Sequence, residues 1–206
     1  MGASERNEEA RSAFREQRIK SLDPNKLVFV DQSGTNITLA PLYEWAPKGQ
    51  RAFGNASRNW GKNITLIASL STGGMGASIE CFEGATDSAA FQTYVEHFLV
   101  PNLSKGQIVV MDKSLQVHKS LRVRKLIEDA GANVLFVPPY SPDFSPIEKG
   151  AFSKVKTIVP KAQARTHEAL IEAIGIALDA VSRRDAVGFF EHCGYHARDQ
   201  LLGKPL

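Results

Sequence analysis

Short apolar runs rich in β-branched residues alternate with turn sequences through the first half of the chain. This pattern predicts β-strands at 27–32, about 36–45, 62–71 and 76–83. Between two of the runs stands Thr72-Gly73-Gly74, which is typical of a tight turn. Because such links are short, we expect neighbouring strands to pair antiparallel, as a meander.

The periodicity changes after Thr86-Asp87, where apolar residues recur every three or four positions up to Pro101. This spacing predicts a helix. The pattern then predicts strands at 107–112 and 133–137, and helices at about 118–130, 146 to about 159, 167–181 and 183–192. Thr166 and Ser182 are expected to cap the last two helices. Strands followed by alternating strands and helices indicate an α/β fold with a mixed sheet flanked by helices.

Composition bounds the class of protein without deciding its function. The chain has 206 residues, of which 43% are hydrophobic and 23% charged, and its net charge is +3. These values are ordinary for a globular protein with one domain. No apolar run approaches the ~20 residues that span a membrane, and Cys81 and Cys193 lie outside any zinc-binding or disulfide pattern. We expect a reduced cytosolic protein with a charged helical leader at 1–26, either solvated or partly ordered, and one domain at 27–206.

Three isolated acidic residues follow predicted strands. Asp31 ends the run Leu27-Val28-Phe29-Val30, and Asp112 ends the run Ile108-Val109-Val110-Met111. Glu148 follows a segment with four prolines between 138 and 146, which restrict the backbone of the segment. Ser145 is expected to be the N-cap of the next helix, Pro146 its first residue and Glu148 its third.

Each acid also has a simpler structural explanation. Asp31 and Asp112 are each followed by polar residues, where an aspartate often forms an Asx-turn. Ser145 and Glu148 have the spacing of a capping box, in which the glutamate bonds back to the N-cap amide. Taken together, however, the three carboxylates at the ends of elements favour a site for two Mg²⁺ ions, which prefer oxygen ligands.

Thirty-five residues separate Asp112 from Glu148. This spacing resembles the DD(35)E signature of transposases and retroviral integrases. The chain more specifically resembles the catalytic half of mariner-superfamily bacterial insertion-sequence transposases, and the similarity extends over about residues 27–195. The segments that carry it are Leu27-Val28-Phe29-Val30-Asp31-Gln32-Ser33-Gly34, Ile108-Val109-Val110-Met111-Asp112 with His118-Lys119, and Phe136-Val137-Pro138-Pro139-Tyr140-Ser141-Pro142-Asp143-Phe144-Ser145-Pro146-Ile147-Glu148.

The resemblance implies a ribonuclease-H-like fold, with a mixed five-stranded sheet flanked by helices. It implies a metal-dependent enzyme that cleaves DNA at the ends of a mobile element and transfers the freed strand into target DNA. Asp31, Asp112 and Glu148 would be the catalytic residues and would bind two Mg²⁺ or Mn²⁺ ions.

The chain also departs from the family pattern. Lys113 follows Asp112 where family members usually have asparagine, and this cation could either repel a metal ion or contact a DNA phosphate. Two alternatives therefore stay open. One is a catalytically impaired relative that binds DNA or a partner, and the other is a ribonuclease-H-like nuclease or resolvase without strand transfer.

Cations gather in two segments that contain no acidic residue, 46–62 and 149–165. Such clusters can bind DNA phosphates, and an aromatic residue among them can stack on a base. The alternative is an ordinary solvated surface, with the tryptophan turned into the core. The candidate DNA-binding residues are Lys48, Arg51, Trp60, Lys62, Lys113, His118, Lys119, Lys149, Lys154 and Lys156.

About 26 residues precede the first predicted strand, fewer than a helix-turn-helix domain needs. We therefore expect recognition of the element ends by a separate helix-turn-helix subunit or by the product of an upstream reading frame. The resemblance further implies a homo-oligomer assembled on DNA, in the bacterial cytoplasm near the nucleoid and not in a membrane.

Overall fold

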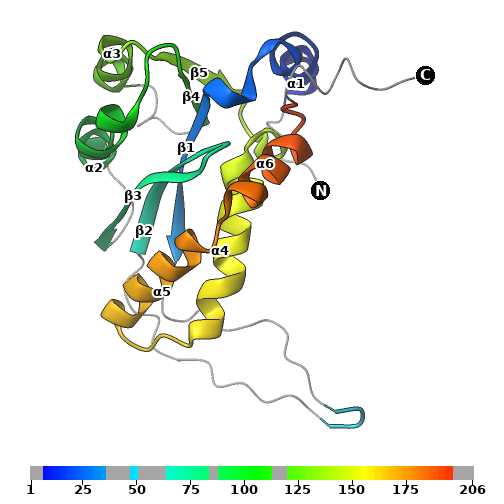
Figure 1. The fold of residues 1–206 in the computed structure, drawn as a ribbon, viewed down its shortest axis with the longest axis vertical. Coiled ribbons are helices and arrows are strands. Elements are labelled where there is room, and N and C mark those ends of the chain that lie inside the picture. The colour runs from blue at the N-terminus through cyan, green and yellow to red at the C-terminus, as the bar shows by residue number, and fades with distance from the viewer. Residues whose placement is uncertain (1–6, 36–46, 51–63, 84–87, 113–119, 197–206) are drawn as a thin grey trace.

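A five-stranded mixed sheet forms the centre of the fold in the computed structural model, which describes residues 7–35, 47–50, 64–83, 88–112 and 120–196 (Figure 1). The order of the strands across the sheet is β3-β2-β1-β4-β5. The strands are β1 (Leu27–Thr35), β2 (Ile64–Ser71), β3 (Gly74–Glu83), β4 (Ile108–Asp112) and β5 (Asn133–Val137). The predicted α/β class and the mixed sheet are confirmed.

Strands β1, β2 and β3 form the predicted antiparallel meander, while β4 and β5 add to the other edge of β1 in parallel. The strand predicted at about 36–45 lies outside the described residues. Strand β1 is longer than the sequence predicted, because it continues through Ser33-Gly34 to Thr35, which pairs with Ile64 of β2. The hydrogen-bonded ladder thus overrides the local turn preference of Ser33-Gly34.

Helical segments join and cover the strands. They are α1 (Glu8–Ala13), η1 (Phe14–Arg18), η2 (Ile19–Ser21), η3 (Pro24–Lys26), α2 (Ser88–Tyr94), η4 (Val95–Leu99), η5 (Val100–Asn102), α3 (Leu121–Asp129), η7 (Pro142–Phe144), η8 (Ile147–Phe152), α4 (Ser153–Ile158), η9 (Val159–Ala162), α5 (His167–Asp179) and α6 (Arg183–His192). Both predicted caps are present. The Thr166 hydroxyl accepts a hydrogen bond from the Ala169 N–H, and Ser182 and Asp185 form a capping box.

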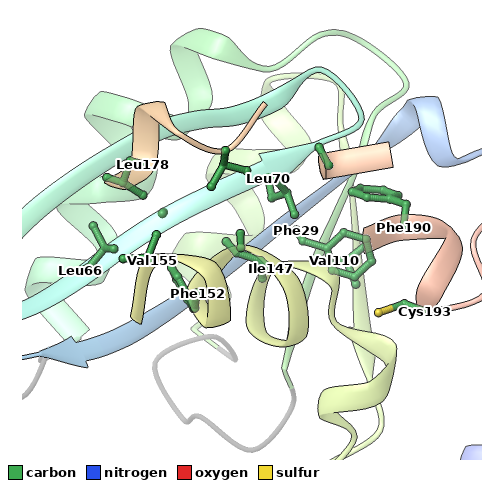
Figure 2. Packing of buried hydrophobic residues seen from close by; sticks show 14 of the residues in the cluster. Phe29, Leu66, Leu70, Val110, Ile147, Phe152, Val155, Leu178, Phe190 and Cys193 are labelled. Atoms are coloured by element: carbon green, nitrogen blue, oxygen red, sulfur yellow. The ribbon is translucent and has the colours of Figure 1, made fainter. Parts of the chain in front are cut away.

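Helices cover both faces of the sheet (Figure 1). Alternate residues of a strand point to opposite faces. Val28 and Val30 therefore pack against α2 and α3, while Leu27 and Phe29 pack into the core beneath η8, α4, α5 and α6. Figure 2 shows this second core, in which Phe29 and Val110 of the sheet face Ile147 of η8.

The N-terminal helical segment is mostly exposed but packs on the rest of the molecule through three buried side chains. Arg11, Phe14 and Ile19 are buried against the rest of the molecule. The predicted helix is present from Glu8 to Ser21, and most of its residues are exposed. Its three buried contacts were not predicted, because one of the buried side chains is an arginine, which sequence alone assigns to the surface.

Candidate active site

Strands β1 and β4 place the two aspartates side by side. The strands are parallel, and their last register pair is Phe29 with Val110, so Asp31 and Asp112 each stand two residues further along. Neighbouring strands lie about 4.8 Å apart where they are paired, and this pairing ends two residues before the aspartates. Because side chains alternate along a strand, both aspartates share the face of Phe29 and Val110, which is the face covered by η8.

The sequence predicted Asp31 at the carboxyl end of its strand, and this prediction was wrong. It pairs with Ala68 inside the β1–β2 ladder, and β1 continues to Thr35. The ladder also rules out the Asx-turn explanation for Asp31. Asp112 is the last residue of β4, as predicted.

The proline-rich segment places Glu148 in the first turn of η8. Ser145 has extended backbone (φ −112°, ψ 98°) and Pro146 is helical (φ −58°, ψ −31°). The Ser145 hydroxyl accepts a hydrogen bond from the Glu148 N–H at 3.4 Å, and the Ser145 carbonyl accepts one from the Lys149 N–H at 3.0 Å. The prediction that Ser145 is the N-cap, with Pro146 first and Glu148 third, is confirmed.

The return bond of a capping box is replaced at this helix start. The Ser145 N–H donates to the Pro142 carbonyl at 3.0 Å, so the amide that a glutamate would cap already has a backbone partner. Helix η8 also lies very close to α6 at Gly150, where a Cβ atom would overlap Cγ of Phe189. Gly150 therefore permits the close packing that fixes the helix carrying Glu148.

All three acids line one small cleft, together with Ser141 and Ser145. The pKa of Asp31 is raised to about 7, mainly by burial, and further by repulsion from Glu148 and Asp112. A hydrogen bond from the Gln32 N–H and attraction to Lys156 partly offset these effects. The carboxylates are therefore close enough to influence one another electrostatically.

Glu148 is influenced by Asp112 and by two lysines. Burial raises its pKa, repulsion from Asp112 raises it further, and attraction to Lys156 and Lys149 lowers it. Crowded carboxylates of this kind are costly in the ionised state unless a cation compensates them. This electrostatic arrangement fits a divalent cation, and carboxylate oxygens are the ligands that Mg²⁺ and Mn²⁺ prefer.

The carboxylates do not form a closed set of metal ligands. Across the described ranges, no three His, Cys, Asp or Glu side chains already surround a common point where one ion could sit. The structure thus brings the three predicted acids to one cleft but does not arrange them around a single ion site.

The predicted DNA-binding cations have different environments. Lys149 and Lys156 are exposed, and Lys156 lies near enough to Asp31 and Glu148 to affect the pKa of both. Lys48 is exposed in the turn at 47–50.

Lys154 has a structural contact, since its Nζ donates to the Ala180 carbonyl at 2.7 Å and to Oδ2 of Asp185 at 2.8 Å. The other candidates lie outside the described residues: Arg51, Trp60, Lys62, Lys113, His118 and Lys119.

Sequence reasoning missed the contact between Arg11 and Asp143 beside this site, and the lining role of Ser141. Asp143 and Ser141 belong to the proline-rich segment that precedes Glu148, so the four prolines of this segment already indicated a fixed structure around them. Nothing in the local pattern distinguishes Arg11 from the other charged residues of its helix.

Comparison with known families agrees with this geometry. Residues 26–171, which contain all three acids, match the family described as DDE superfamily endonuclease. The chain belongs to this family. Among curated protein sequences, none matches this DDE superfamily member.

Solved transposase structures share the fold of this DDE domain. The Mos1 strand transfer complex matches with a TM-score of 0.73 and 17% identity, over 94% of this chain and 60% of that chain. The Mos1 mariner paired end complex with Mn matches with a TM-score of 0.72 and 17% identity, over 94% and 63% of the two chains. The catalytic domain of Mos1 mariner transposase matches with a TM-score of 0.61 and 13% identity, over 90% and 83%. These matches confirm the ribonuclease-H-like fold.

This chain spans 60% to 63% of the length of the longer transposase chains that it matches. Within the part that the structure describes, no helix is both long and apolar enough to cross a membrane.

Proposed function

We propose that this DDE domain is the catalytic domain of a transposase, which cleaves phosphodiester bonds at the ends of a mobile element and joins the freed 3′ ends to target DNA. One observation carries the proposal: Asp31, Asp112 and Glu148 come from three separate elements and line the same cleft. Their order and spacing are those of the DDE signature, and the family match includes all three.

In this proposal the three carboxylates hold two divalent ions, Mg²⁺ or Mn²⁺. When bound, these ions would activate a water molecule for attack and stabilise negative charge on the scissile phosphate. Asp31 must lose its proton before it can act as a ligand, and its pKa of about 7 makes that loss coupled to binding.

Lys156 and Lys149 are proposed to hold the DNA backbone beside the acids. Both are exposed on the helical segment that follows Glu148, and Lys156 acts electrostatically on two of the three acids. A phosphate that approaches the cleft therefore meets positive charge on this side. We leave Lys154 out of the proposed contacts because Asp185 and Ala180 already engage it.

The Mos1 structures were solved as a strand transfer complex and as paired end complexes with Mn or Mg, which supports metal and DNA as the ligands of this fold. Oligomerisation on DNA, a separate helix-turn-helix subunit and a place in the bacterial cytoplasm near the nucleoid stay predictions.

The test uses labelled duplexes that carry the terminal repeats flanking the reading frame, incubated with Mg²⁺ or Mn²⁺. Wild-type protein should nick them, and Asp112→Ala should reduce the rate by on the order of 10²-fold or more. Joined products in the presence of target DNA identify a transposase, whereas cleavage without joining identifies a nuclease or resolvase.

Equal background in both proteins would contradict the proposal and favour the impaired relative. In that case Lys113→Asn, which restores the residue usual in the family, tests whether the cation beside Asp112 is the cause. Recovery of cleavage in Lys113→Asn would assign the defect to that residue.

A further inference from the structure

The N-terminal helix contacts the segment that carries Glu148. The Arg11 side chain is only 3% exposed, and its Nη2 donates to Oδ1 and Oδ2 of Asp143 at 3.0 and 2.8 Å. The guanidinium carbon also lies 4.7 Å from the centre of the Phe144 ring, a cation–π contact. Arg15 contacts the same two residues from a more exposed position.

Phe144 is the anchor of this contact. It is 2% exposed, and its ring packs 5.4 Å from the ring of Phe14 on the same helical segment as Arg11. Its carbonyl accepts a buried hydrogen bond from the Tyr195 hydroxyl at 2.9 Å. Residues from both ends of the described chain therefore converge on Asp143-Phe144.

Hydrogen bonds between nearby residues connect this anchor to Glu148. The Phe144 N–H donates to the Ser141 carbonyl, and the Ser145 N–H donates to the Pro142 carbonyl, each at 3.0 Å. Ser145 then caps Glu148. A displacement of Asp143-Phe144 would be transmitted to Glu148, because only Ser145 separates Phe144 from Pro146, whose ring fixes φ at the helix start.

Stability alone is a poor explanation for Arg11. Its Nε and Nη1 are buried without a hydrogen-bond partner among the described residues, although Nε also lies 3.5 Å from Oε2 of Glu8 in an ion pair. The hydrogen bonds and charges of Asp143 and Glu8 raise the pKa of Arg11 against the effect of burial, but an apolar side chain of similar size at a buried place often stabilises a protein as well or better. An arginine here makes sense if the contact of its Nη2 with both carboxylate oxygens of Asp143, together with the guanidinium over the Phe144 ring, has a use of its own.

We propose that Arg11 is a positioning residue for Glu148: by clamping Asp143-Phe144, the N-terminal helix sets the place of the third acid of the site. This inference rests on the proposed function, since it assigns Glu148 to the reaction. It makes the segment Glu8–Ser21 part of the catalytic unit.

The test compares Arg11→Met with Arg18→Met, a matched control, since Arg18 is exposed and belongs to the same helical segment. Amide hydrogen exchange is measured over peptides covering 142–150 and over β1 and β4. Arg11→Met should speed exchange at Glu148 and Lys149 by about tenfold, with β1 and β4 unchanged, whereas Arg18→Met should match wild type.

Cleavage kinetics give a second readout. In Arg11→Met, kcat should fall by about tenfold to a hundredfold while KM changes less than about twofold, because DNA contacts stay in place and only the acid is displaced. Arg11→Lys keeps the charge but lacks the planar guanidinium that lies over the Phe144 ring, so it should recover part of kcat.

The inference is overturned if exchange at 142–150 is the same in Arg11→Met as in Arg18→Met, or if exchange rises equally throughout the chain. Should Arg11→Met not fold, Arg11→Lys is judged by the same exchange criteria. Hydrogen exchange requires neither metal nor DNA. If the wild-type protein does not cleave DNA, the proposed function is refuted, but the exchange measurement still tests whether Arg11 positions Glu148.

Discussion

Asp31 is the residue where function and stability are most clearly opposed. It is held in a central strand by the β1–β2 ladder, beside Asp112 and near Glu148. Burial and repulsion disfavour its ionised form, which is the form that could bind a cation. In the metal-free protein this residue should therefore cost folding free energy at neutral pH.

Asp31→Asn should stabilise the metal-free protein at high pH. The pKa of Asp31 is about 7 in the folded protein, above its usual value of 3.8, so between these values the folded state keeps a proton that the unfolded state loses. Stability of the wild type should then fall as pH rises from about 4 to about 7, by at most about 4 kcal/mol and less because the side chain is partly exposed.

Urea unfolding at about pH 5 and about pH 8, with chelator present, measures this difference. Asp31→Asn should be the more stable protein at about pH 8, should have lost most of the pH dependence, and should not cleave DNA. Parallel pH profiles for wild type and Asp31→Asn would contradict the assigned pKa.

At the scale of elements, one helix carries two lysines with different tasks. Lys154 of α4 joins the start of α6 through Asp185 and the Ala180 carbonyl, while Lys156 is exposed and lies near the acids. Two residues apart on a helix, they point in different directions. Sequence alone could not separate them, because both belong to the same run of cations.

Lys154→Met should therefore affect stability, whereas Lys156→Met should affect DNA binding. Lys154→Met should lower the free energy of unfolding by about 1 kcal/mol and leave DNA affinity unchanged. Lys156→Met should change the free energy of unfolding by less than about 0.5 kcal/mol. It should lower the number of counterions released on DNA binding, given by the slope of log K against log[salt], by about one. Thermal unfolding and binding titrations at several salt concentrations distinguish the two, and a loss of DNA affinity in Lys154→Met alone would reverse the assignment.

The contact between η8 and α6 gives a second prediction at this scale. Gly150→Ala should destabilise the protein by about 1–3 kcal/mol, because the new Cβ atom would overlap the base of the Phe189 side chain. Gly188→Ala, on the facing helix, has nothing within 4 Å of its Cβ position and should be up to about 1 kcal/mol more stable. Denaturant unfolding of the pair measures both, and equal effects would show that the two helices pack differently.

Elements with strong local signals were predicted well from sequence. Thr166, Ser182 and Ser145 cap helices as expected, and the meander follows from its turns. The extension of β1 to Thr35 could not be predicted, since pairing with β2 decides it. The burial of Arg11 was also hidden, because its partner is 132 residues away in the chain.

For the whole molecule, binding of cations should be linked to folding. If the acids hold Mn²⁺, the ion stabilises the folded state by RT ln(1 + [Mn²⁺]/Kd), which is about 2.7 kcal/mol at a concentration of a hundred times Kd. The melting temperature of the wild type should rise with Mn²⁺, and the rise should be larger at about pH 8 than at about pH 6, because Asp31 must be deprotonated.

Asp112→Ala should abolish most of this rise, and the control Lys154→Met should keep it. Scanning calorimetry with and without chelator makes the comparison. An equal rise in wild type and Asp112→Ala would place the bound ion elsewhere on the molecule.

The strand order has one consequence for ion selectivity. Asp31 and Asp112 stand on β1 and β4, which have neighbours along both edges, so neither backbone can shift without breaking a ladder. Adjustment to cations of different radius is thus left to the turn before Glu148. Substitutions that loosen or stiffen this turn should change the preference between small ions such as Mg²⁺ and larger ones such as Ca²⁺.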